Sequence, residues 1–472
     1  MTALNGLLVI ELCGDRGQYM GKLMGDMGAR VIKIEPVSGS QERNIGPFKN
    51  DIPNPNSSLY FWARNTSKES IAIDLNSTEG IKIIKQLLEN ADVFLEDYEP
   101  GFLGSIGLGY EGLSKANNSL IMTSLTGFGQ DGPYKSYKSN DLVALAMGGI
   151  MHSCGYDDVP ESPPIRPSGG HGDFISAHYG LIGTLTALFY RDFTGHGQYL
   201  DVSAHEACSS TTEASIPTYL FLKKEVFRQT GRHQGATPTP KTLCKTSDGK
   251  YIIVFQLFNN LNSWMSLVKW MAGKGMAEDL EDEKFKDMAR HITSNPDDSD
   301  HAFEVVRSFI LNHTADEIYR GAQELKYPWG IVRSPEENLE DPHFLEDRGM
   351  FEDILHPEFG EGVSYKYAGR PYRFKGTPWN AFRAPLIGEH SVSILKDDLN
   401  YSDEAIRNLE VTGIISSLKS ENCEMIARLM DDELDDGWMM RDIGPRTADG
   451  VRTHMDYLGP LHNSPFGAIN TE

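Results

Sequence analysis

Positive charge is scarce in this chain of 472 residues. Lysine and arginine together number 44 and aspartate and glutamate 67, which gives a formal net charge of −23 at pH 7. A surface this acidic repels phosphodiester backbones and anionic lipid, although a local basic pocket for a phosphate-bearing ligand is compatible with it. No apolar run approaches the roughly 20 residues that a membrane span needs. We therefore expect partners other than nucleic acid or a membrane.

Cysteine is also sparse and shows no paired spacing. The five cysteines are scattered and form no CxxC pair: Cys13, Cys154, Cys208, Cys244 and Cys423. This pattern argues against a disulfide framework or a zinc site and fits a reducing compartment. The first residues lack the basic segment and cleavage site of a signal peptide. We expect a cytoplasmic enzyme of two or three domains.

The familiar nucleotide and hydrolase motifs are missing as well. No GxGxxG follows the first predicted strand, and GxxxxGK[ST], GxSxG and HExxH do not occur. Gly21 and Gly25 are better explained by close packing of a helix on a sheet than by dinucleotide binding. Four histidines match no metal-ligand spacing: His171, His178, His196 and His205. We therefore expect no metal site.

Alternating apolar and amphipathic stretches fill the first third of the chain. Strands are expected at residues 6–12, 29–35, 70–75, 91–96 and 120–125, and helices at 19–27 and 78–90. Strands separated by helices indicate right-handed βαβ crossovers and a mostly parallel sheet. Ligands of such sheets bind beyond the carboxyl ends of the strands, so the loops that follow the predicted strands are candidate binding loops.

The later part of the chain predicts a second unit. An extended segment is expected over 198–203, and a polar stretch rich in Gly, Thr and Pro at 231–240 indicates the crossing. A hairpin of 241–245 and 251–255 opens the second unit, and short strands return over 351–374. The expected division is a large domain over 1–230, a small domain over 231–345, a return segment over 346–414 and an extension of unknown role over 415–472.

The most informative stretch surrounds Asp173, which follows a glycine-bearing loop and opens an apolar helix expected over 173–191. One interpretation makes Asp173 the helix N-cap, since its carboxylate would satisfy free backbone N–H groups. The other makes it a nucleophile, because a helix N-terminus keeps a carboxylate ionised and an ionised carboxylate can attack an acyl carbon. Small side chains along the helix would let other segments approach closely: Ser176, Ala177, Gly180 and Gly183.

Several further motifs follow one another in a characteristic order between residues 4 and 409. They are GARVIKIEP at 28–36, NTSKES at 65–70, ADVFLE at 91–96, GFGQDGP at 127–133, GD at 172–173, TGHGQYLDVS at 194–203 and PLIGEH at 385–390. In these motifs the chain resembles the class III CoA-transferases, a family that includes formyl-CoA:oxalate and carnitine CoA-transferases.

The resemblance implies an α/β fold. Its large domain would be an incomplete Rossmann-like fold built from N- and C-terminal parts, with a smaller α+β domain between them, and two chains would interlock as a homodimer. The resemblance also implies that Asp173 attacks an acyl-CoA thioester. The mixed anhydride so formed would pass through an aspartyl-CoA thioester while carboxylic acids exchange. The substrates would be an acyl-CoA and a carboxylic acid, with no metal, redox cofactor or ATP.

Family positions for coenzyme A carry over to six residues. Three are basic and would contact the CoA phosphates and nearby groups: Arg43, Lys68 and Lys138. Asp97 and Tyr98 stand where the family usually has Asn-Phe beside the adenine, so Tyr98 can still stack while Asp97 lacks the amide donor. Ser105 stands where many members have an arginine, which implies one phosphate contact fewer.

The first loop departs from the family pattern. It contains Arg16 and Gln18 where members commonly have Ala-Gly-Pro, so both side chains would face an unusual acyl group. A cationic Arg16 near the reacting centre suits a substrate that carries a second carboxylate. Asp141 would bind the anhydride or orient the acceptor acid.

Two alternatives share the chemistry of Asp173. An α-methylacyl-CoA racemase has the same fold but needs a second base for the opposite face of the α-carbon. Asn140 stands where racemases have a histidine, which leaves His171 or His178 as the remaining candidate bases. In the other alternative, the chain is the competent subunit of a hetero-oligomeric transferase. The sequence leaves the donor and acceptor acids open.

Overall fold

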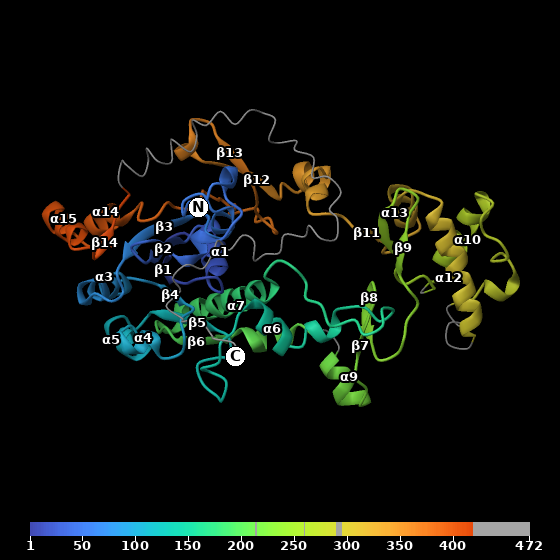
Figure 1. The fold of residues 1–472 in the computed structure, drawn as a ribbon, viewed down its shortest axis with the longest axis horizontal. Helices are drawn as coiled ribbons and strands as arrows, with labels where there is room; N and C mark the ends of the chain where they lie inside the picture. Colours follow the sequence, from blue (N-terminus) through green and yellow to red (C-terminus); the bar gives the residue numbers. More distant parts are fainter. Residues whose placement is uncertain (213–214, 259, 289–294, 419–472) are drawn as a thin grey trace, which may run out of the picture. The chain divides into compact units, whose positions relative to one another are not determined.

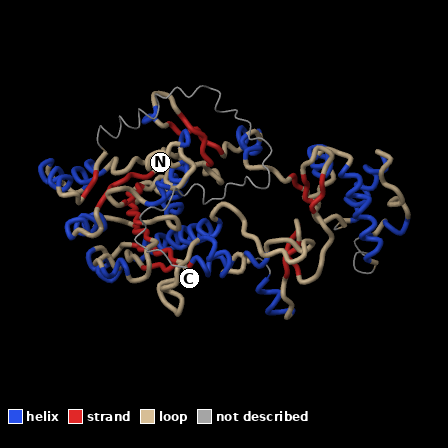
Figure 2. The backbone as a smooth tube through the Cα atoms, viewed as in Figure 1, coloured by secondary structure: helices blue, strands red, loops and turns tan. Residues whose placement is uncertain are grey.

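The computed structural model describes residues 1–212, 215–258, 260–288 and 295–418, drawn in Figure 1 and Figure 2. These residues form two compact units, each treated separately below. The first unit contains residues 1–144, 170–208 and 345 onward, and the second contains residues 145–169 and 209–344.

The observed units differ from the expected division at two places. Residues 145–169 and 209–230 belong to the second unit, whereas the sequence analysis assigns them to the large domain. The chain therefore leaves the first unit before residue 170, returns to it for residues 170–208 and leaves it again. Composition along the sequence does not reveal these two additional crossings. Most of the extension expected over 415–472 lies outside the described residues, which end at 418.

The first unit is built on a seven-stranded sheet. Its strands follow the order β14-β3-β2-β1-β4-β5-β6, and only β14 runs antiparallel to its neighbour. The strands are β1 (Leu8–Leu12), β2 (Arg30–Glu35), β3 (Lys68–Ile73), β4 (Val93–Glu96), β5 (Ile121–Thr126), β6 (Tyr199–Ser203) and β14 (Ile415–Ser416). The order 3-2-1-4-5-6 is that of a doubly wound dinucleotide-binding fold. The predicted α/β class and parallel sheet are confirmed.

Helices cover both faces of this sheet (Figure 1). Val9 of β1 faces the core formed with α1 (Gln18–Asp26) and α7 (His171–Thr194). Ile10 and Leu12 face the core formed with α3 (Thr78–Leu88), α5 (Tyr110–Ala116) and α15 (Asp403–Val411). Strands buried on both faces consist of near-continuous apolar runs, which explains why the sequence predicts them well.

Shorter elements complete the first unit. They are α2 (Leu59–Arg64), α4 (Phe102–Ser105), α14 (Ser391–Ser393) and the antiparallel pair β12 (Phe351–Leu355) and β13 (Ser364–Ala368), whereas α6 (Asp141–Met147) and α8 (Ala204–Ser210) begin in this unit and end in the second. Figure 2 shows β12 and β13 as a separate ribbon of two strands.

Glycines bring α1 and α7 close to the sheet. A β-carbon at Gly180 of α7 would lie 3.0 Å from Leu125 Cδ2, and one at Gly21 of α1 would lie 1.7 Å from Glu11 Oε2. Larger side chains at these positions would push the helices away from the strands. The packing role predicted for both glycines is confirmed.

The second unit has a small antiparallel sheet and a helical core. The predicted hairpin is confirmed as β9 (Leu243–Lys245) and β10 (Tyr251–Ile253), and β11 (Gly330–Ile331) adds a third strand. The other elements are α10 (Leu261–Gly273), α12 (Pro296–Leu311), α13 (Ala315–Glu324), α9 (Ser215–Leu222) and the pair β7 (Phe227–Gln229) and β8 (Arg232–Gly235). Trp264, Phe285 and Phe309 lie in the core of this unit. Within the described ranges, no helix combines the length and the apolar character that crossing a lipid bilayer requires.

Candidate active site

Asp173 lies in the first turn of α7, at the end of the helix where carboxylates are stabilised. The helix begins at His171, after Gly170 in a left-handed conformation with φ of 75°, so Gly170 is the N-cap and Asp173 the third helical residue. The interpretation of Asp173 as the N-cap is therefore wrong. The Gly172 N–H donates instead to Asp141 Oδ1 at 2.7 Å. Asp141 thus caps α7 from α6 and leaves the Asp173 carboxylate for another role.

The surroundings of Asp173 make its carboxylate unusually basic. Burial raises its pKa from the ordinary 3.8 to about 7, and the negative charges of Asp141, Asp15 and Asp97 act in the same direction. Arg16 opposes this shift, with Nε 3.8 Å from Asp173 Oδ1. A carboxylate that is poorly solvated and half ionised near pH 7 has the character of a catalytic group rather than a surface charge.

The loop after β1 presents Arg16 to Asp173 and is held from two directions. The carboxylate of Asp97, which follows β4, accepts the backbone N–H groups of Gly14 at 2.8 Å and Gly17 at 3.0 Å. On the other side, Lys68 Nζ donates to the Gln18 carbonyl oxygen at 2.6 Å. The carboxyl ends of adjacent parallel strands thus meet here, as expected for a ligand site in a doubly wound sheet.

A cavity of about 130 Å³ adjoins this loop. Its wall brings together four of the predicted site residues: Arg16, Asp97, Tyr98 and Lys138. Tyr98 stacks on Phe102, with ring centroids 4.8 Å apart, while Lys138 is exposed and pairs with Glu99. The cavity therefore offers aromatic and cationic groups beside the loop that faces Asp173.

The remaining predicted CoA contacts lie elsewhere. Arg43 is fully buried, and its guanidinium donates to Glu35 Oε2 at 2.6 Å, to Glu35 Oε1 at 2.7 Å and to the Pro385 carbonyl oxygen at 2.9 Å. Lys68 is buried and pairs with Glu11 Oε2 at 2.7 Å. Neither side chain lines this cavity; Arg43 is paired with Glu35, and Lys68 shares Glu11 with Lys33 and lines a different cavity described below, so their contact with CoA phosphates stays a prediction.

Three further predicted residues have distinct surroundings. Ser105 is exposed, and its hydroxyl donates to the Phe102 carbonyl oxygen at 2.7 Å. Gln18 is fully buried, with Oε1 accepting from Asn65 Nδ2 at 2.8 Å and Nε2 donating to Asp15 Oδ1 at 3.1 Å. His171 is exposed at the first position of α7.

Sequence reasoning missed Tyr60 and Arg64, which come from the short helix α2. Tyr60 donates its hydroxyl proton to Asp15 Oδ1 at 2.7 Å, and the Arg64 guanidinium lies 3.8 Å from the centre of the Tyr60 ring. The same guanidinium lies 5.2 Å from the ring of Phe174, the neighbour of Asp173. A spacing of four residues within a helix was the available signal, and it is too common to identify a site.

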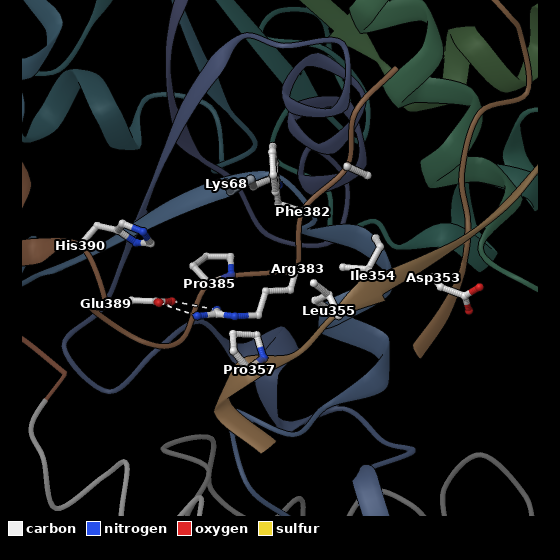
Figure 3. A pocket seen from close by; sticks show the side chains of 11 residues that line it. Lys68, Asp353, Ile354, Leu355, Pro357, Phe382, Arg383, Pro385, Glu389 and His390 are labelled. Atoms are coloured by element: carbon white, nitrogen blue, oxygen red, sulfur yellow. Dashed lines mark hydrogen bonds and ion pairs between the residues drawn. The ribbon is translucent and has the colours of Figure 1, made fainter. Parts of the chain in front are cut away.

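A second cavity, of about 480 Å³, lies beside β12 and the segment 381–390 (Figure 3). Its arginine, Arg383, is neutralised by Glu389, with Nη1 2.9 Å from Oε2, and by Glu358, with Nε 2.9 Å from Oε2. A neutralised arginine offers no charge for an anionic substrate. Neither Asp173 nor Arg16 lines this cavity, whereas Arg16 lines the smaller one, so the candidate site is the one at the carboxyl ends of β1 and β4.

The described ranges also contain side chains of the kinds that could bind a metal ion. No group of three His, Cys, Asp or Glu side chains in these residues is arranged to hold a metal ion.

Comparison with known proteins decides the family. The family model described as CoA-transferase family III matches residues 4–391. The chain belongs to CoA-transferase family III. It is accordingly a transferase enzyme, and the resemblance found in the sequence motifs is confirmed.

Three curated relatives are 26–30% identical to this transferase over most of its length. The succinyl-CoA:(R)-benzylsuccinate CoA-transferase subunit BbsE of Thauera aromatica is 30% identical over 390 residues, covering 82% of this chain and 92% of the relative. The succinyl-CoA:glutarate CoA-transferase of Homo sapiens is 30% identical over 427 residues, covering 87% and 90%. A formyl-CoA:oxalate CoA-transferase of Streptomyces avermitilis is 26% identical over 430 residues, covering 88% and 99%.

A solved structure supports the same fold. A CAIB/BAIF family protein from Brucella suis superposes with a TM-score of 0.69 at 28% identity, covering 84% of this chain and 99% of that protein. The similarity therefore extends across nearly the whole length of that protein.

Proposed function

We propose that Asp173 is the nucleophile of a transferase that moves CoA from an acyl-CoA thioester to a free carboxylic acid. The observation that carries the proposal is the Asp173 carboxylate itself, which is 20% exposed in the first turn of α7 with Arg16 beside it. Such a carboxylate is accessible to an acyl group, is poorly solvated by water and is held at a helix N-terminus.

The proposed reaction begins and ends with one thioester and has four acyl-transfer steps. A carboxylate oxygen of Asp173 attacks the acyl carbonyl carbon, the carbon–sulfur bond breaks, and CoA thiolate and a mixed anhydride form. The thiolate then attacks the aspartyl carbonyl carbon and expels the donor acid as a carboxylate, which leaves an aspartyl-CoA thioester. The acceptor carboxylate attacks this thioester and forms a new anhydride, and the thiolate attacks its acyl carbon. The last step yields the new acyl-CoA and regenerates Asp173. No electron or net proton is transferred.

Residues around Asp173 would hold it in place through these steps. Asp141 fixes the Gly172 amide and with it the first turn of α7. Asp97 and Lys68 fix the loop that carries Arg16. A rigid frame of this kind keeps the nucleophile near its attack geometry, which is a main source of enzymatic rate enhancement.

CoA itself would bind at the cavity beside the loop. Tyr98 offers a ring for stacking, and the exposed Lys138 would exchange its surface ion pair with Glu99 for a CoA phosphate. The names of several relatives give succinyl-CoA as the donor, which makes succinyl-CoA the first donor to test.

Racemisation is the weaker alternative. Asn140 Oδ1 accepts the Val143 N–H at 3.0 Å, which makes Asn140 a cap of α6. An amide in this position does not titrate and cannot take a proton from an α-carbon. The curated relatives named above are transferases, which also favours exchange of acids.

The proposal includes a homodimer of interlocked chains. Three large apolar side chains on α7 are more than 60% exposed: Ile182, Phe189 and Phe193. Their spacing places them along one side of the helix, and an exposed apolar stripe of this kind marks a protein interface. Two relatives are named as subunits, so the alternative is an assembly with a different second chain. Light scattering of the purified protein tests this: a dimer mass supports the homodimer, and a monomer mass supports the alternative.

Replacement of Asp173 tests the function directly. We expect Asp173→Ala to abolish exchange between succinyl-CoA and a panel of free acids, while folding and CoA affinity stay near wild type. The matched control is Asp192→Asn, because Asp192 is an exposed carboxylate on the same helix. Mass spectrometry of the CoA products is the readout, and near-normal turnover by the Asp173 variant would contradict the proposal.

A further inference from the structure

Arg16 and Arg43 are both largely buried, but their guanidinium groups are satisfied to different degrees. The Arg43 guanidinium has partners on all three nitrogens, among them both oxygens of Glu35. The Arg16 side chain is 13% exposed. Among the described residues, it donates one long hydrogen bond, from Nη2 to the Ser139 carbonyl oxygen at 3.4 Å, and its buried Nε has no hydrogen-bond partner. Arg16 thus has N–H donors that can still form hydrogen bonds inside the site.

The other carboxylates near Asp173 have donors of their own. Asp15 accepts from Tyr60, Asp97 accepts from two backbone N–H groups, and Asp141 accepts from the Gly172 N–H. The ion pair of Arg16 is with Asp173, at 3.8 Å. The ion pair of Arg16 therefore depends on the carboxylate that the proposed reaction consumes.

Formation of the anhydride removes that partner. When an Asp173 oxygen bonds to the acyl carbon, its side chain becomes neutral, while Arg16 stays cationic. The Arg16 guanidinium then loses its ion pair and still has a buried Nε without a hydrogen-bond partner, so an acyl group that brings an anion of its own supplies a new partner at this position. Asp97 and Lys68 hold the backbone of the loop around Arg16, which fixes the point from which the guanidinium extends.

We infer that Arg16 is the specificity-determining residue of this transferase and selects acids that carry a second carboxylate. In the free enzyme it pairs with Asp173, and in the anhydride it pairs with the distal carboxylate of the acyl group. The inference rests on the proposed transfer through Asp173 and adds to it the class of acid. Planar guanidinium groups bind carboxylates through two parallel hydrogen bonds, which suits this exchange of partners.

The test compares acids of equal chain length that differ in the distal carboxylate. Each acyl-CoA is incubated with its own labelled acid: succinyl-CoA with succinate, butyryl-CoA with butyrate, glutaryl-CoA with glutarate and valeryl-CoA with valerate. Label entering the acyl-CoA measures kcat/KM for one acid at a time. The proteins are wild type, Arg16→Gln, Arg16→Lys and the control Arg407→Gln, which removes an exposed arginine of α15.

We expect wild type to prefer the dicarboxylates. Arg16→Gln should lower the preference, which is the ratio of kcat/KM for a dicarboxylate to that for the monocarboxylate of equal chain length, on the order of 100-fold. Arg16→Lys keeps the charge and should retain part of the preference, which separates recognition from a folding defect. Arg407→Gln should match wild type with every acid.

Two results would overturn the inference, and they are distinguishable. An equal loss of both kinds of exchange in Arg16→Gln would assign Arg16 to the CoA thiolate or to Asp173 alone, and CoA transfer would stand. A wild-type preference for monocarboxylates would also refute the selection. If wild type exchanges none of the acids, the proposed function itself is contradicted.

Discussion

Asp173→Asn should make the protein more stable, and the gain should grow with pH. Burial raises the pKa of Asp173 in the folded chain to about 7, against an ordinary value of 3.8. The wild type therefore carries no penalty below pH 3.8, loses stability as the pH rises through about 7, and loses no more above it. Asparagine is neutral at every pH and escapes this loss.

The size of the gain follows from the two pKa values. The gap between 3.8 and about 7 corresponds to roughly 4 kcal/mol in the free energy of unfolding when the carboxylate is fully ionised. For a chain of this size, that difference moves the unfolding temperature by roughly 5 °C. Near pH 5 the same carboxyl group is protonated in the folded state, so the difference in unfolding free energy between Asp173→Asn and wild type is expected to be smaller there.

The assay is unfolding of the CoA-free protein in urea or by heat, at one protein concentration, between pH 5 and pH 8. The difference between variant and wild type cancels the titration of all other groups. The control Asp192→Asn should show a small difference that does not change with pH, since Asp192 is exposed. The reasoning is refuted if Asp173→Asn gives no gain at pH 8, or if its gain is the same at pH 5.

Three other changes test separate parts of the account. Arg43→Ala leaves the buried Glu35 without its counter-ion and should cost about 3–5 kcal/mol in urea unfolding; unchanged stability with weaker CoA binding would restore the predicted phosphate contact. Arg16→Gln removes the charge that lowers the pKa of Asp173, so the acidic limb of the profile of kcat/KM against pH should move to higher pH, and an unmoved limb would argue against their pairing. Phe193→Glu places a charge on the exposed stripe of α7 and should weaken the homodimer in light scattering, whereas an unaffected dimer would exclude this stripe from the interface.

The sequence predicts the fold well because the decisive signals are local. Strands such as β1 and β4 carry apolar residues on both faces, and helices such as α3 keep a helical spacing of apolar residues. The position of Asp173 near a helix start follows from the glycine-bearing loop and the apolar run after it. These features need no knowledge of distant partners.

The site was harder to predict because its groups depend on tertiary partners. Arg43 and Lys68 are long cations that usually lie at the surface, and only the folded chain reveals Glu35 and Glu11 beside them. The cap that Asp141 provides for α7 joins residues far apart in sequence, so no local pattern encodes it. Arg16 stood out in the sequence through its departure from the family, and the structure adds its unsatisfied Nε.

The most direct test of the central claim is to trap the acyl group on the enzyme. The protein is mixed with succinyl-CoA, treated with hydroxylamine and digested, and the peptides are sequenced by mass spectrometry. Hydroxylamine attacks an aspartyl anhydride or thioester and leaves a hydroxamate at that residue. The account expects a hydroxamate on Asp173 that requires succinyl-CoA and is absent when free CoA is used instead. Label on another carboxylate, or complete exchange activity with Asp173 unmodified, would contradict it.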